Sequence, residues 1–539
     1  MRVLCLGMDG ADPELVGRLL DEGRLPTLAG IVRDGAYGRL RSTLPAATPT
    51  AWSTFVTGLN PARHGIFNFS TNANRAQSRV ESGRSRAGTP LWRTLGAAGV
   101  RSAFVTVPFT YPAEEIAGIT VTGYGGPAEP EIAPASAAAA IRARHPGLVT
   151  AHHPMRERWW EDFDRYARLL IEHVDQIASV CEQCFELEPD LGLLVVDFMS
   201  TDFAGHLGYA RLDPGHPAHD PAHSGDELVQ VYQAVDAACG RLIESARERF
   251  GEEPTVLMMS DHGMKPIYRV FHTNRWLEEH GHLHYRRRSL QGLRGTRLDG
   301  LTRVDRRLGR TAGWYTALLD RLPGVPGVPV DRAFADIDFP RTRAYAFATG
   351  GQIYLGESSG AVRDPAYAER LAQEFEAVKH PDTGEPLLHV LRKADIYHGP
   401  YLDRAPDLII LAVDERVHID SLRRRGTGAF EVHDHLDPEN AYGYSGHHGV
   451  DGILGARGPG IRPGVVPEGS GIVQMAATIL RLHGIGADGL DGEPIDDILQ
   501  AGDEAVHVAA EQATASEQGV YSADEEAGIL ERLRDLGYE

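Results

Sequence analysis

The chain has 539 residues, a formal net charge of −21 at pH 7 and 42% hydrophobic residues. This apolar content is typical of a soluble globular protein, whereas the charge argues against a general surface for nucleic-acid polymers or anionic membranes, whose phosphates it would repel. The four cysteines are too few and too scattered for a disulfide scaffold. The N-terminal apolar run is too short for a signal peptide and no later run approaches about 20 apolar residues, so we expect a cytoplasmic protein without a membrane span.

Four short apolar runs that end in a polar or acidic residue are predicted to be strands. Their sequences are RVLCLGMD, RSAFVTVPF, LGLLVVDF and PTVLMMSD. Longer runs with helical periodicity lie between them, at 14–35, 91–99, 165–187 and 226–250. Strands that alternate with helices in this way predict an α/β fold with a mainly parallel sheet flanked by helices. The CxxC of Cys181 and Cys184 falls inside a helical run without a second pair, so we interpret both thiols as packing residues rather than a redox or zinc site.

The strand–helix rhythm changes between residues 266 and 435, which we predict to be an inserted cap or substrate subdomain. This stretch contains an arginine-rich run at 285–310 and a Pro-Gly segment at 322–330. The basic run is either a solvated helix face or a patch that faces the substrate. The remaining predicted units are the first part of a catalytic core at 1–265, its last part at 436–502, and an acidic, helical C-terminal tail at 503–539.

Three motifs and the end of the first predicted strand supply residues that can bind metal ions. The motifs are DFAGH, SDHGM and GHHGVD, and the candidate ligands are Asp9, Asp202, His206, Asp261, His262 and His448. Each residue alone has an ordinary explanation as a capping aspartate or a hydrogen-bonded histidine. Together, their carboxylate oxygens and imidazole nitrogens suit Zn²⁺, Mn²⁺ or Fe rather than Ca²⁺. Six ligands divide into two metal sites, and two ions about 4 Å apart stabilise the attacking and leaving oxygens in phosphoryl displacement.

The segment TLPAATPTAWSTFVTG at 43–58 is predicted to begin a helix, with Thr48 as the N-cap and Pro49 at the first helical position. The structural interpretation is a capped helix and nothing more. The functional interpretation is that the Thr48 hydroxyl lies beside unpaired backbone N–H groups, where a phosphate would bind. A hydroxyl bound to a metal ion there would become a nucleophile.

From MRVLCLGMDGADPEL to about residue 500, the sequence resembles the type I phosphodiesterase and nucleotide pyrophosphatase family of the alkaline phosphatase superfamily. The family's segment ending in TGLxPxxHGI appears as TPTAWSTFVTGLNPARHGIF, and counting back from Thr57 places the nucleophile at Thr48. The resemblance implies an alkaline-phosphatase-like α/β fold. It also implies one metal ion held by Asp9, Thr48, Asp261 and His262, and a second held by Asp202, His206 and His448.

The resemblance further implies a hydrolase that cleaves phosphodiester or nucleotide pyrophosphate bonds in a small phosphate ester or nucleotide. Two divalent metal ions are expected, Zn²⁺ first, with Mn²⁺ or Fe as alternatives. Nucleotide pyrophosphatases of the family carry an asparagine three residues after the nucleophile, whereas this chain has Ala51. We therefore expect a different donor to hold a phosphate oxygen, and the candidates are the helix N-terminal amides, Asn68 and Lys265. His447 is a further candidate for a phosphate contact.

Two other functions remain open at this point, and two more are disfavoured. The same scaffold would serve a phosphomonoesterase acting on a small phosphorylated metabolite, or a phosphate-ester mutase. A sulfatase is disfavoured because no cysteine lies near Thr48. A metal-stabilised binding protein is disfavoured because a silent site has no need for a nucleophile beside a full set of ligands.

Overall fold

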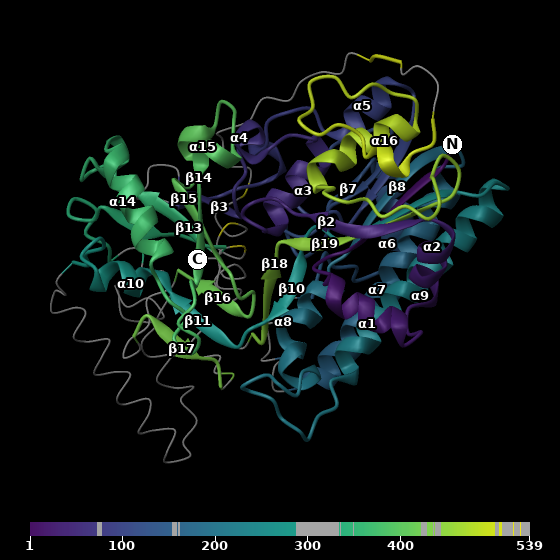
Figure 1. Ribbon diagram of the computed structural model, residues 1–539. Helices are drawn as coiled ribbons and strands as arrows, with labels where there is room; N and C mark the ends of the chain where they lie inside the picture. The colour runs from purple at the N-terminus through teal and green to yellow at the C-terminus, as the bar shows by residue number, and fades with distance from the viewer. Residues whose placement is uncertain are drawn as a thin grey trace, which may run out of the picture.

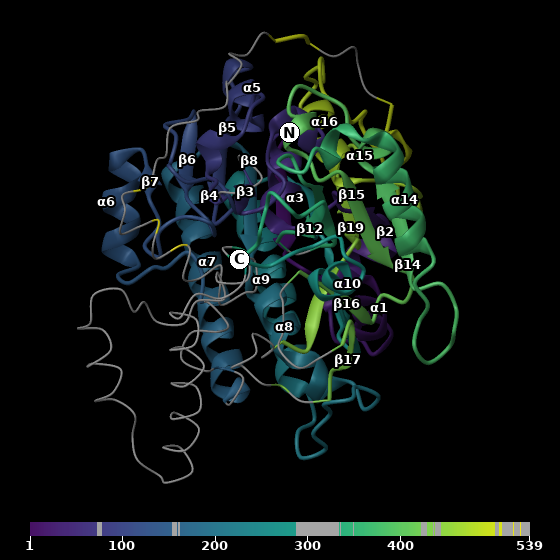
Figure 2. The ribbon, with the colours of Figure 1, turned by 90° about the vertical axis from the view of Figure 1, so that its left-hand side faces the viewer.

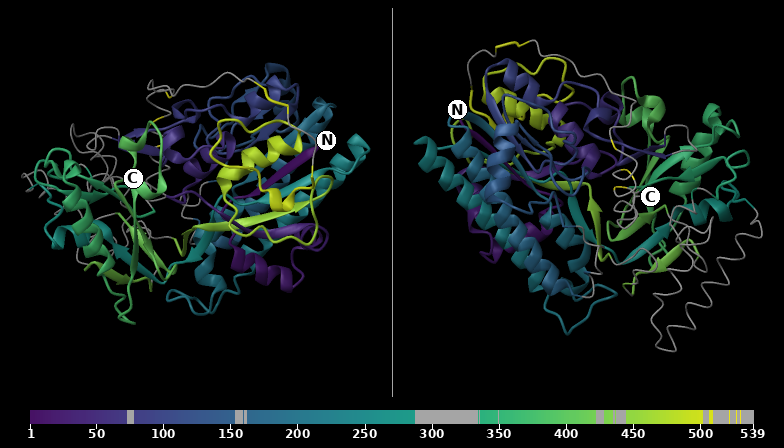
Figure 3. Two further views of the ribbon diagram at one scale, coloured as in Figure 1. Left: turned by 45° about the horizontal axis from the view of Figure 1, so that its top comes forward. Right: turned by 180° about the vertical axis from the view of Figure 1, so that it is seen from behind.

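The computed structural model describes residues 1–72, 78–152, 159, 162–286, 334, 336–348, 350–421, 428–434, 436, 444–501, 506–508, 521, 526 and 529. Nearly all of the arginine-rich run, the whole Pro-Gly segment and most of the predicted C-terminal tail lie outside these residues. The described chain forms a larger and a smaller lobe, seen from several sides in Figures 1 and 3. Within the described part, no helix is both long enough and apolar enough to cross a bilayer.

An eight-stranded sheet forms the centre of the larger lobe, in the order β2-β19-β9-β1-β8-β5-β6-β7. Its five central strands are parallel: β9 (Thr255–Met259), β1 (Val3–Met8), β8 (Leu191–Phe198), β5 (Arg101–Val105) and β6 (Gly118–Val121). Three strands join antiparallel at the edges: β2 (Ala36–Arg41), β19 (Asp451–Arg457) and β7 (Ile132–Ala133). The four predicted strands are β1, β5, β8 and β9, and the mainly parallel α/β fold is confirmed.

Helices cover both faces of this sheet because successive residues of β1 point to opposite sides. Leu4 and Leu6 face one layer of helices, whereas Val3 and Cys5 face the other. The first layer contains α1 (Pro13–Asp21), α2 (Pro26–Asp34), α7 (Phe163–Leu187), α8 (Ser200–Leu212) and α9 (Asp226–Phe250). The second contains α3 (Thr48–Thr57), α5 (Leu91–Ala97) and α16 (Met475–Leu482). The lobe also includes α4 (Pro61–His64), α6 (Ala135–Arg144), β3 (Ser70–Asn72) and β4 (Ser78–Val80).

The helical run predicted at 14–35 is two helices rather than one. Gly23 has φ +68°, a left-handed conformation that interrupts a right-handed helix. Pro26 then begins α2, in the first-turn position where a missing N–H costs no hydrogen bond.

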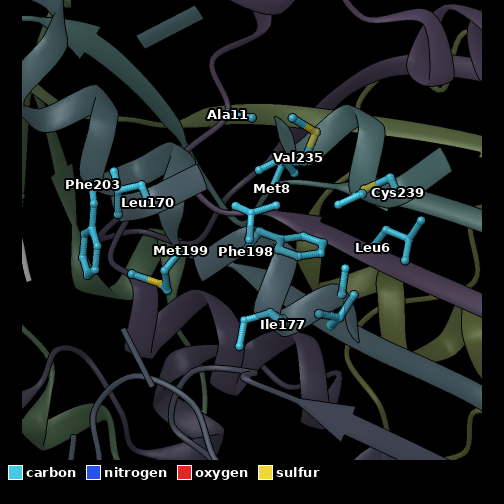
Figure 4. Close-up of a cluster of buried hydrophobic side chains, with 14 of the residues drawn as sticks. Leu6, Met8, Ala11, Leu170, Ile177, Phe198, Met199, Phe203, Val235 and Cys239 are labelled. Atoms are coloured by element: carbon cyan, nitrogen blue, oxygen red, sulfur yellow. The ribbon is translucent and has the colours of Figure 1, made fainter. Parts of the chain in front are cut away.

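Helices α7 and α9 run side by side (Figure 2) and pack against one face of β1 and β8 (Figure 4). Figure 4 shows Leu6 and Phe198 of the sheet among Ile177 of α7 and Cys239 of α9. All four cysteines are buried free thiols. The interpretation of Cys181 as a packing residue therefore agrees with its place in this core.

Replacing Ile177 with alanine is expected to lower the free energy of unfolding by about 2–5 kcal/mol, because it leaves a cavity between α7 and the sheet. Urea denaturation followed by circular dichroism measures this change. Glu172→Ala on the exposed side of the same helix is the control and should change the free energy by less than about 0.5 kcal/mol. Equal effects of the two variants would contradict the assigned packing.

The described part of the smaller lobe contains two sheets and its own apolar core, which includes Trp276, Tyr345 and Phe375. The first sheet has the order β12 (Ala344–Ala346), β13 (Gln352–Leu355), β15 (Leu408–Ala412) and β14 (Leu388–Arg392). The second has the order β16 (Val417–Asp420), β11 (Arg269–His272) and β17 (Phe430–Val432). Among the described residues, its helices are α10 (Thr273–Glu279), α14 (Pro365–Glu376) and α15 (Lys393–Ile396).

A two-stranded ribbon of β10 (Gly263–Pro266) and β18 (Gly446–Gly449) lies between the lobes (Figure 1). The chain enters the smaller lobe after β10 and returns through β18. The smaller lobe has its own core, and the chain enters and leaves it once through the ribbon, as is expected of an inserted unit. The boundaries at 266 and 435 stay a prediction.

Candidate active site

Three neighbouring parallel strands end at the same level of the sheet, because the register aligns the last residues of β1, β8 and β9. Asp9 follows β1 directly, and Asp261 comes two residues after β9. Strand β8 leads into α8, which carries Asp202 in its first turn and His206 one turn later on the same side. The carboxyl edge of the sheet, where α/β proteins bind ligands, thus gathers carboxylates from three strands.

The ribbon between the lobes adds two histidines. His262 directly precedes β10, and His448 lies in β18, which pairs antiparallel with β10. The rings of these two histidines stack, with centroids 3.7 Å apart and planes inclined by 23°. The return of the chain from the smaller lobe therefore brings His448 to the same edge of the sheet.

Helix α3 presents Thr48 to this cluster in a way that differs from the expected N-cap. The N-cap residue is Ala47, which has extended φ and ψ of −133° and 133° and whose carbonyl accepts from Ala51 N at 2.9 Å. The predicted N-cap at Thr48 is wrong by one residue, because the helical hydrogen bonds already begin at Ala47. The Thr48 hydroxyl is consequently not used for capping, and its Oγ1 lies 3.2 Å from Nε2 of His262.

All seven residues predicted as nucleophile or ligand lie in one cluster. Nε2 of His448 lies 3.3 Å from Asp202 Oδ1 and 3.2 Å from His206 Nε2. Nε2 of His262 lies 3.7 Å from Asp9 Oδ1 and 3.4 Å from Asp261 Oδ2. Two groups have ligand atoms within 4.8 Å of one another: Asp9, Asp261 and His262, and Asp202, His262 and His448. His262 belongs to both groups, so the two predicted ligand sets are immediate neighbours.

Each of the three histidines turns the same ring nitrogen towards the cluster. Nδ1 lies 2.9 Å from the Gly446 carbonyl in His206, 3.0 Å from the Ala46 carbonyl in His448, and 3.1 Å from the Gly263 carbonyl in His262. Because a carbonyl only accepts hydrogen bonds, Nδ1 is the donor in each case. Nε2 is then left to face the carboxylates, which is the usual arrangement of metal-binding histidines.

The carboxylates of the cluster are buried and repel one another. Burial raises the pKa of Asp9 well above its usual range, and the charges of Asp261 and Asp197 raise it further. Burial, followed by the charge of Asp202, raises the pKa of Asp261 to about 7. Asp9 Oδ1 and Asp261 Oδ2 have no hydrogen-bond partner among the described residues. Buried orphan oxygens beside imidazole nitrogens form a donor set that fits a divalent cation, and such a charge would offset the repulsion.

The pKa values of His262 and His448 shift in opposite directions. Burial lowers the pKa of His262 well below its usual value, and the charge of His448 adds to this. Burial would also lower the pKa of His448, but its hydrogen bond to Asp202 and the charge of that carboxylate outweigh this effect and raise it. A neutral imidazole is the form that binds metal ions, so the environment of His262 suits a ligand.

Trp52 belongs to the site, although the sequence indicated only that it lies in a helix. Its Nε1 donates to Asp9 Oδ2 at 3.1 Å, and its side chain is fully buried. Trp52 comes four residues after Thr48, so both lie on the same face of α3. This spacing is the signal from which its place could have been inferred.

Trp52→Phe is expected to weaken cation binding by about 10–100-fold, because it removes the hydrogen bond that orients Asp9 while an aromatic ring stays in place. Competition titration with a chromogenic chelator measures this affinity. Trp92→Phe is the matched control, because Trp92 is also buried and its Nε1 has no hydrogen-bond partner in the described part of the chain. Unchanged affinity in Trp52→Phe would remove Trp52 from the site.

The three predicted phosphate donors differ in their hydrogen-bond partners and in the direction that their side chains face. Asn68 is 2% exposed, its Oδ1 accepts from Phe69 N at 2.8 Å, and its Nδ2 has no partner among the described residues. Lys265 of β10 and His447 of β18 pair across the ribbon, and His447 directly precedes His448. Because side chains alternate along a strand, they face away from the cluster.

Lys265 and His447 instead have structural partners. Nζ of Lys265 lies 3.1 Å from carboxylate oxygens of both Asp12 and Glu14. Nε2 of His447 lies 2.7 Å from the Glu415 carbonyl and donates to it. The structure does not bring these two residues to the cluster.

A third group of potential ligands lies away from the cluster, formed by Asp164, His223 and Glu227. Nη1 of Arg211 lies 2.7 Å from Asp164 and 3.7 Å from Glu227. The guanidinium already supplies the positive charge there, so this group is an ion-pair network rather than a second metal centre.

Many solved structures have a similar fold, and two of them are compared with this chain. Human ectonucleotide pyrophosphatase/phosphodiesterase 5 has a TM-score of 0.50 and 17% identity, over 93% of this chain and 100% of that chain. Phosphonoacetate hydrolase from Sinorhizobium meliloti 1021, in complex with phosphonoformate, has a TM-score of 0.53 and 15% identity, over 88% and 94%. At these identities the likeness shows the fold alone.

No curated protein matches the sequence. Residues 3–451 match the type I phosphodiesterase / nucleotide pyrophosphatase family, a range that includes most of the larger lobe and the described part of the smaller lobe. The resemblance drawn from the sequence motifs is thus confirmed. The chain belongs to the type I phosphodiesterase / nucleotide pyrophosphatase family and is a hydrolase of phosphate esters.

Proposed function

We propose that the protein cleaves phosphodiester or nucleotide pyrophosphate bonds, with Thr48 as the nucleophile and two divalent metal ions, Zn²⁺ first and Mn²⁺ or Fe as alternatives. The observation that carries this proposal is the 3.2 Å contact of the Thr48 hydroxyl with His262, within a buried cluster of carboxylates and imidazoles. The residues that would hold the ions are Asp9, Thr48, Asp261 and His262 on one side, and Asp202, His206 and His448 on the other. Bound ions would lower the pKa of the hydroxyl and neutralise charge on the reacting oxygens.

The chain itself supplies the nucleophile and donors for the phosphoryl oxygens. Thr48 opens α3, whose first turn has backbone N–H groups without helical partners and the positive end of the helix dipole. Non-bridging oxygens of a phosphate would bind there. Asn68 Nδ2 is a second donor, because it is buried and has no partner among the described residues. These donors would offset the negative charge that builds up in the transition state.

The reaction would proceed in two displacements. Thr48 Oγ1 attacks phosphorus opposite the leaving oxygen, the bond to that oxygen breaks, and the threonine proton passes to solvent. Water then attacks the phosphothreonine, releases the phosphate or phosphomonoester, and regenerates the hydroxyl. The same residues would serve a monoesterase or a mutase, which differ in the group attached to phosphorus and in its acceptor.

A substrate panel tests the proposed function. Bis(p-nitrophenyl) phosphate, thymidine 5′-p-nitrophenyl phosphate, ATP and p-nitrophenyl phosphate are compared with Zn²⁺, Mn²⁺ and Mg²⁺. The proposal expects the highest kcat/KM with a diester or a nucleotide. A higher value for the monoester would favour the phosphatase alternative. Intramolecular transfer without release of phosphate would favour the mutase alternative.

Removal of divalent cations is expected to destabilise the protein, because the buried carboxylates then repel one another without compensation. At a concentration of 100 times Kd, a ligand that binds only the folded state contributes about 2.7 kcal/mol. The melting temperature, measured by calorimetry, should fall with EDTA and recover when Zn²⁺ or Mn²⁺ is added in excess. An unchanged melting temperature would contradict the proposed metal centre.

The proposed substrate is a small molecule rather than a nucleic-acid polymer, since a net charge of −21 repels a polyanion. A cytoplasmic location stays a prediction from the sequence. The buried free state of all four cysteines is consistent with a reducing compartment.

A further inference from the structure

The segment 42–47 joins β2 to the nucleophile, so its position decides where the Thr48 hydroxyl lies. Two of its carbonyl groups are held by residues far away in the sequence. The Ala46 carbonyl accepts from His448 Nδ1 at 3.0 Å. The Leu44 carbonyl accepts from the hydroxyl of Tyr397. The second contact comes from the smaller lobe, because Tyr397 directly follows α15.

Tyr397 is built into the contact between the lobes. It is 5% exposed, and burial raises its pKa well above the usual value, so its hydroxyl keeps its proton and donates. Its ring packs edge-on against Phe67, with centroids 5.5 Å apart and planes inclined by 78°. Phe67 directly precedes Asn68, and Leu44 packs against the same apolar cluster. One side chain of the smaller lobe therefore contacts both segments that carry the proposed nucleophile and phosphate donor.

The segment around Tyr397 is fixed to α4, beside which α15 lies in Figure 1. Asn60 Nδ2 donates to the His398 carbonyl at 2.9 Å, and Tyr401 N donates to the Ala62 carbonyl at 2.9 Å. Gly399 has φ +139°, and a Cβ atom there would lie 2.5 Å from the Ala62 carbonyl oxygen. The backbones thus approach too closely for any residue except glycine. This docking gives Tyr397 a fixed position from which to act.

We propose that Tyr397 is a positioning residue, supplied by the smaller lobe, that sets the nucleophile segment through its hydrogen bond to the Leu44 carbonyl. The inference rests on the proposed role of Thr48 as the nucleophile. Through Tyr397, the lobe that we predict to select the substrate also acts on the rate of attack. A shift of the nucleophile by about 1 Å is enough to slow a reaction by about 100-fold, so a single hydrogen bond in this segment affects turnover.

Tyr397→Phe tests this role, because it removes the hydroxyl and keeps the ring packed on Phe67. With bis(p-nitrophenyl) phosphate, kcat and the first-turnover release of p-nitrophenol should fall by about 10-fold or more. KM should stay within about 2-fold and the metal content should be unchanged, because the variant loses neither a ligand nor a substrate contact. Tyr401→Phe is the matched control in the same segment. Its hydroxyl makes no hydrogen bond among the described residues, so this variant should keep the parent kcat.

A second variant tests the same role without removing the Tyr397 hydroxyl, in case Tyr397→Phe does not fold. Phe67→Leu keeps the hydroxyl of Tyr397 and loosens its ring, and it should also lower kcat with little change in KM. A parent-like kcat in Tyr397→Phe, an equal fall in Tyr401→Phe, or a fall explained by lost metal ions would overturn the proposal. Thr48→Ala in the same assay separates the two ideas. An inactive Thr48→Ala beside a normal Tyr397→Phe refutes only the positioning role, whereas an active Thr48→Ala refutes the proposed function.

Discussion

Thr48→Ala is expected to lower kcat for bis(p-nitrophenyl) phosphate by at least about 10⁴-fold, because it removes the hydroxyl that we propose as the nucleophile. The contact that motivates this expectation is the 3.2 Å separation of Thr48 Oγ1 and His262 Nε2. Metal content should remain nearly intact, because Asp9, Asp261 and His262, the other proposed ligands on that side, are unchanged. Steady-state kinetics and elemental analysis of the same preparation measure both quantities.

Two variants give this experiment its controls. Thr57→Ala removes another buried hydroxyl from α3, one that donates to the Ser53 carbonyl at 2.7 Å and takes no part in the cluster. It should keep ordinary turnover. Thr48→Ser keeps a hydroxyl and should retain measurable activity. Ordinary turnover in Thr48→Ala would remove this residue from its proposed role.

The core of the fold was predictable because its signals are local. The central strands are short, buried on both faces and continuous in apolar character, as parallel strands are. Three of the four predicted strands, β1, β8 and β9, also end close to an acidic residue, and this is why Asp9 and Asp261 could be placed at one edge of the sheet. The start of α3 was missed by one residue because the helical hydrogen bonds begin at Ala47, which no side-chain signal marks.

The site was predictable where residue type and motif spacing determine position, and not where pairing between distant strands does. Asp202 and His206 lie four residues apart on one helix, which the sequence shows directly. The orientation of Lys265 and His447 depends on the register of β10 with β18, across about 180 residues of chain. A shift of one residue in that register exchanges the two faces. The contact of Tyr397 with Leu44 likewise depends on the docking of two lobes.

His448→Ala is expected to lower the occupancy of one of two metal ions and to reduce kcat by at least about 10³-fold. His448 Nε2 lies within 3.3 Å of Asp202 and 3.2 Å of His206 Nε2, so its loss leaves that side with two ligands. Asp9, Asp261 and His262 remain on the other side, with their orienting bonds intact. Elemental analysis should therefore give about one ion per chain in place of two.

The neighbouring residue provides the control for this measurement. His447→Ala changes the same strand, but this side chain faces away from the cluster and donates to the Glu415 carbonyl, so both ions should remain bound. His262→Ala should have the larger effect on metal content, because His262 lies within reach of both groups of ligands. Loss of both ions in His448→Ala would mean that the two sites form one cooperative centre. Loss of neither would mean that His448 is not a ligand, and either result contradicts the division of ligands between two ions.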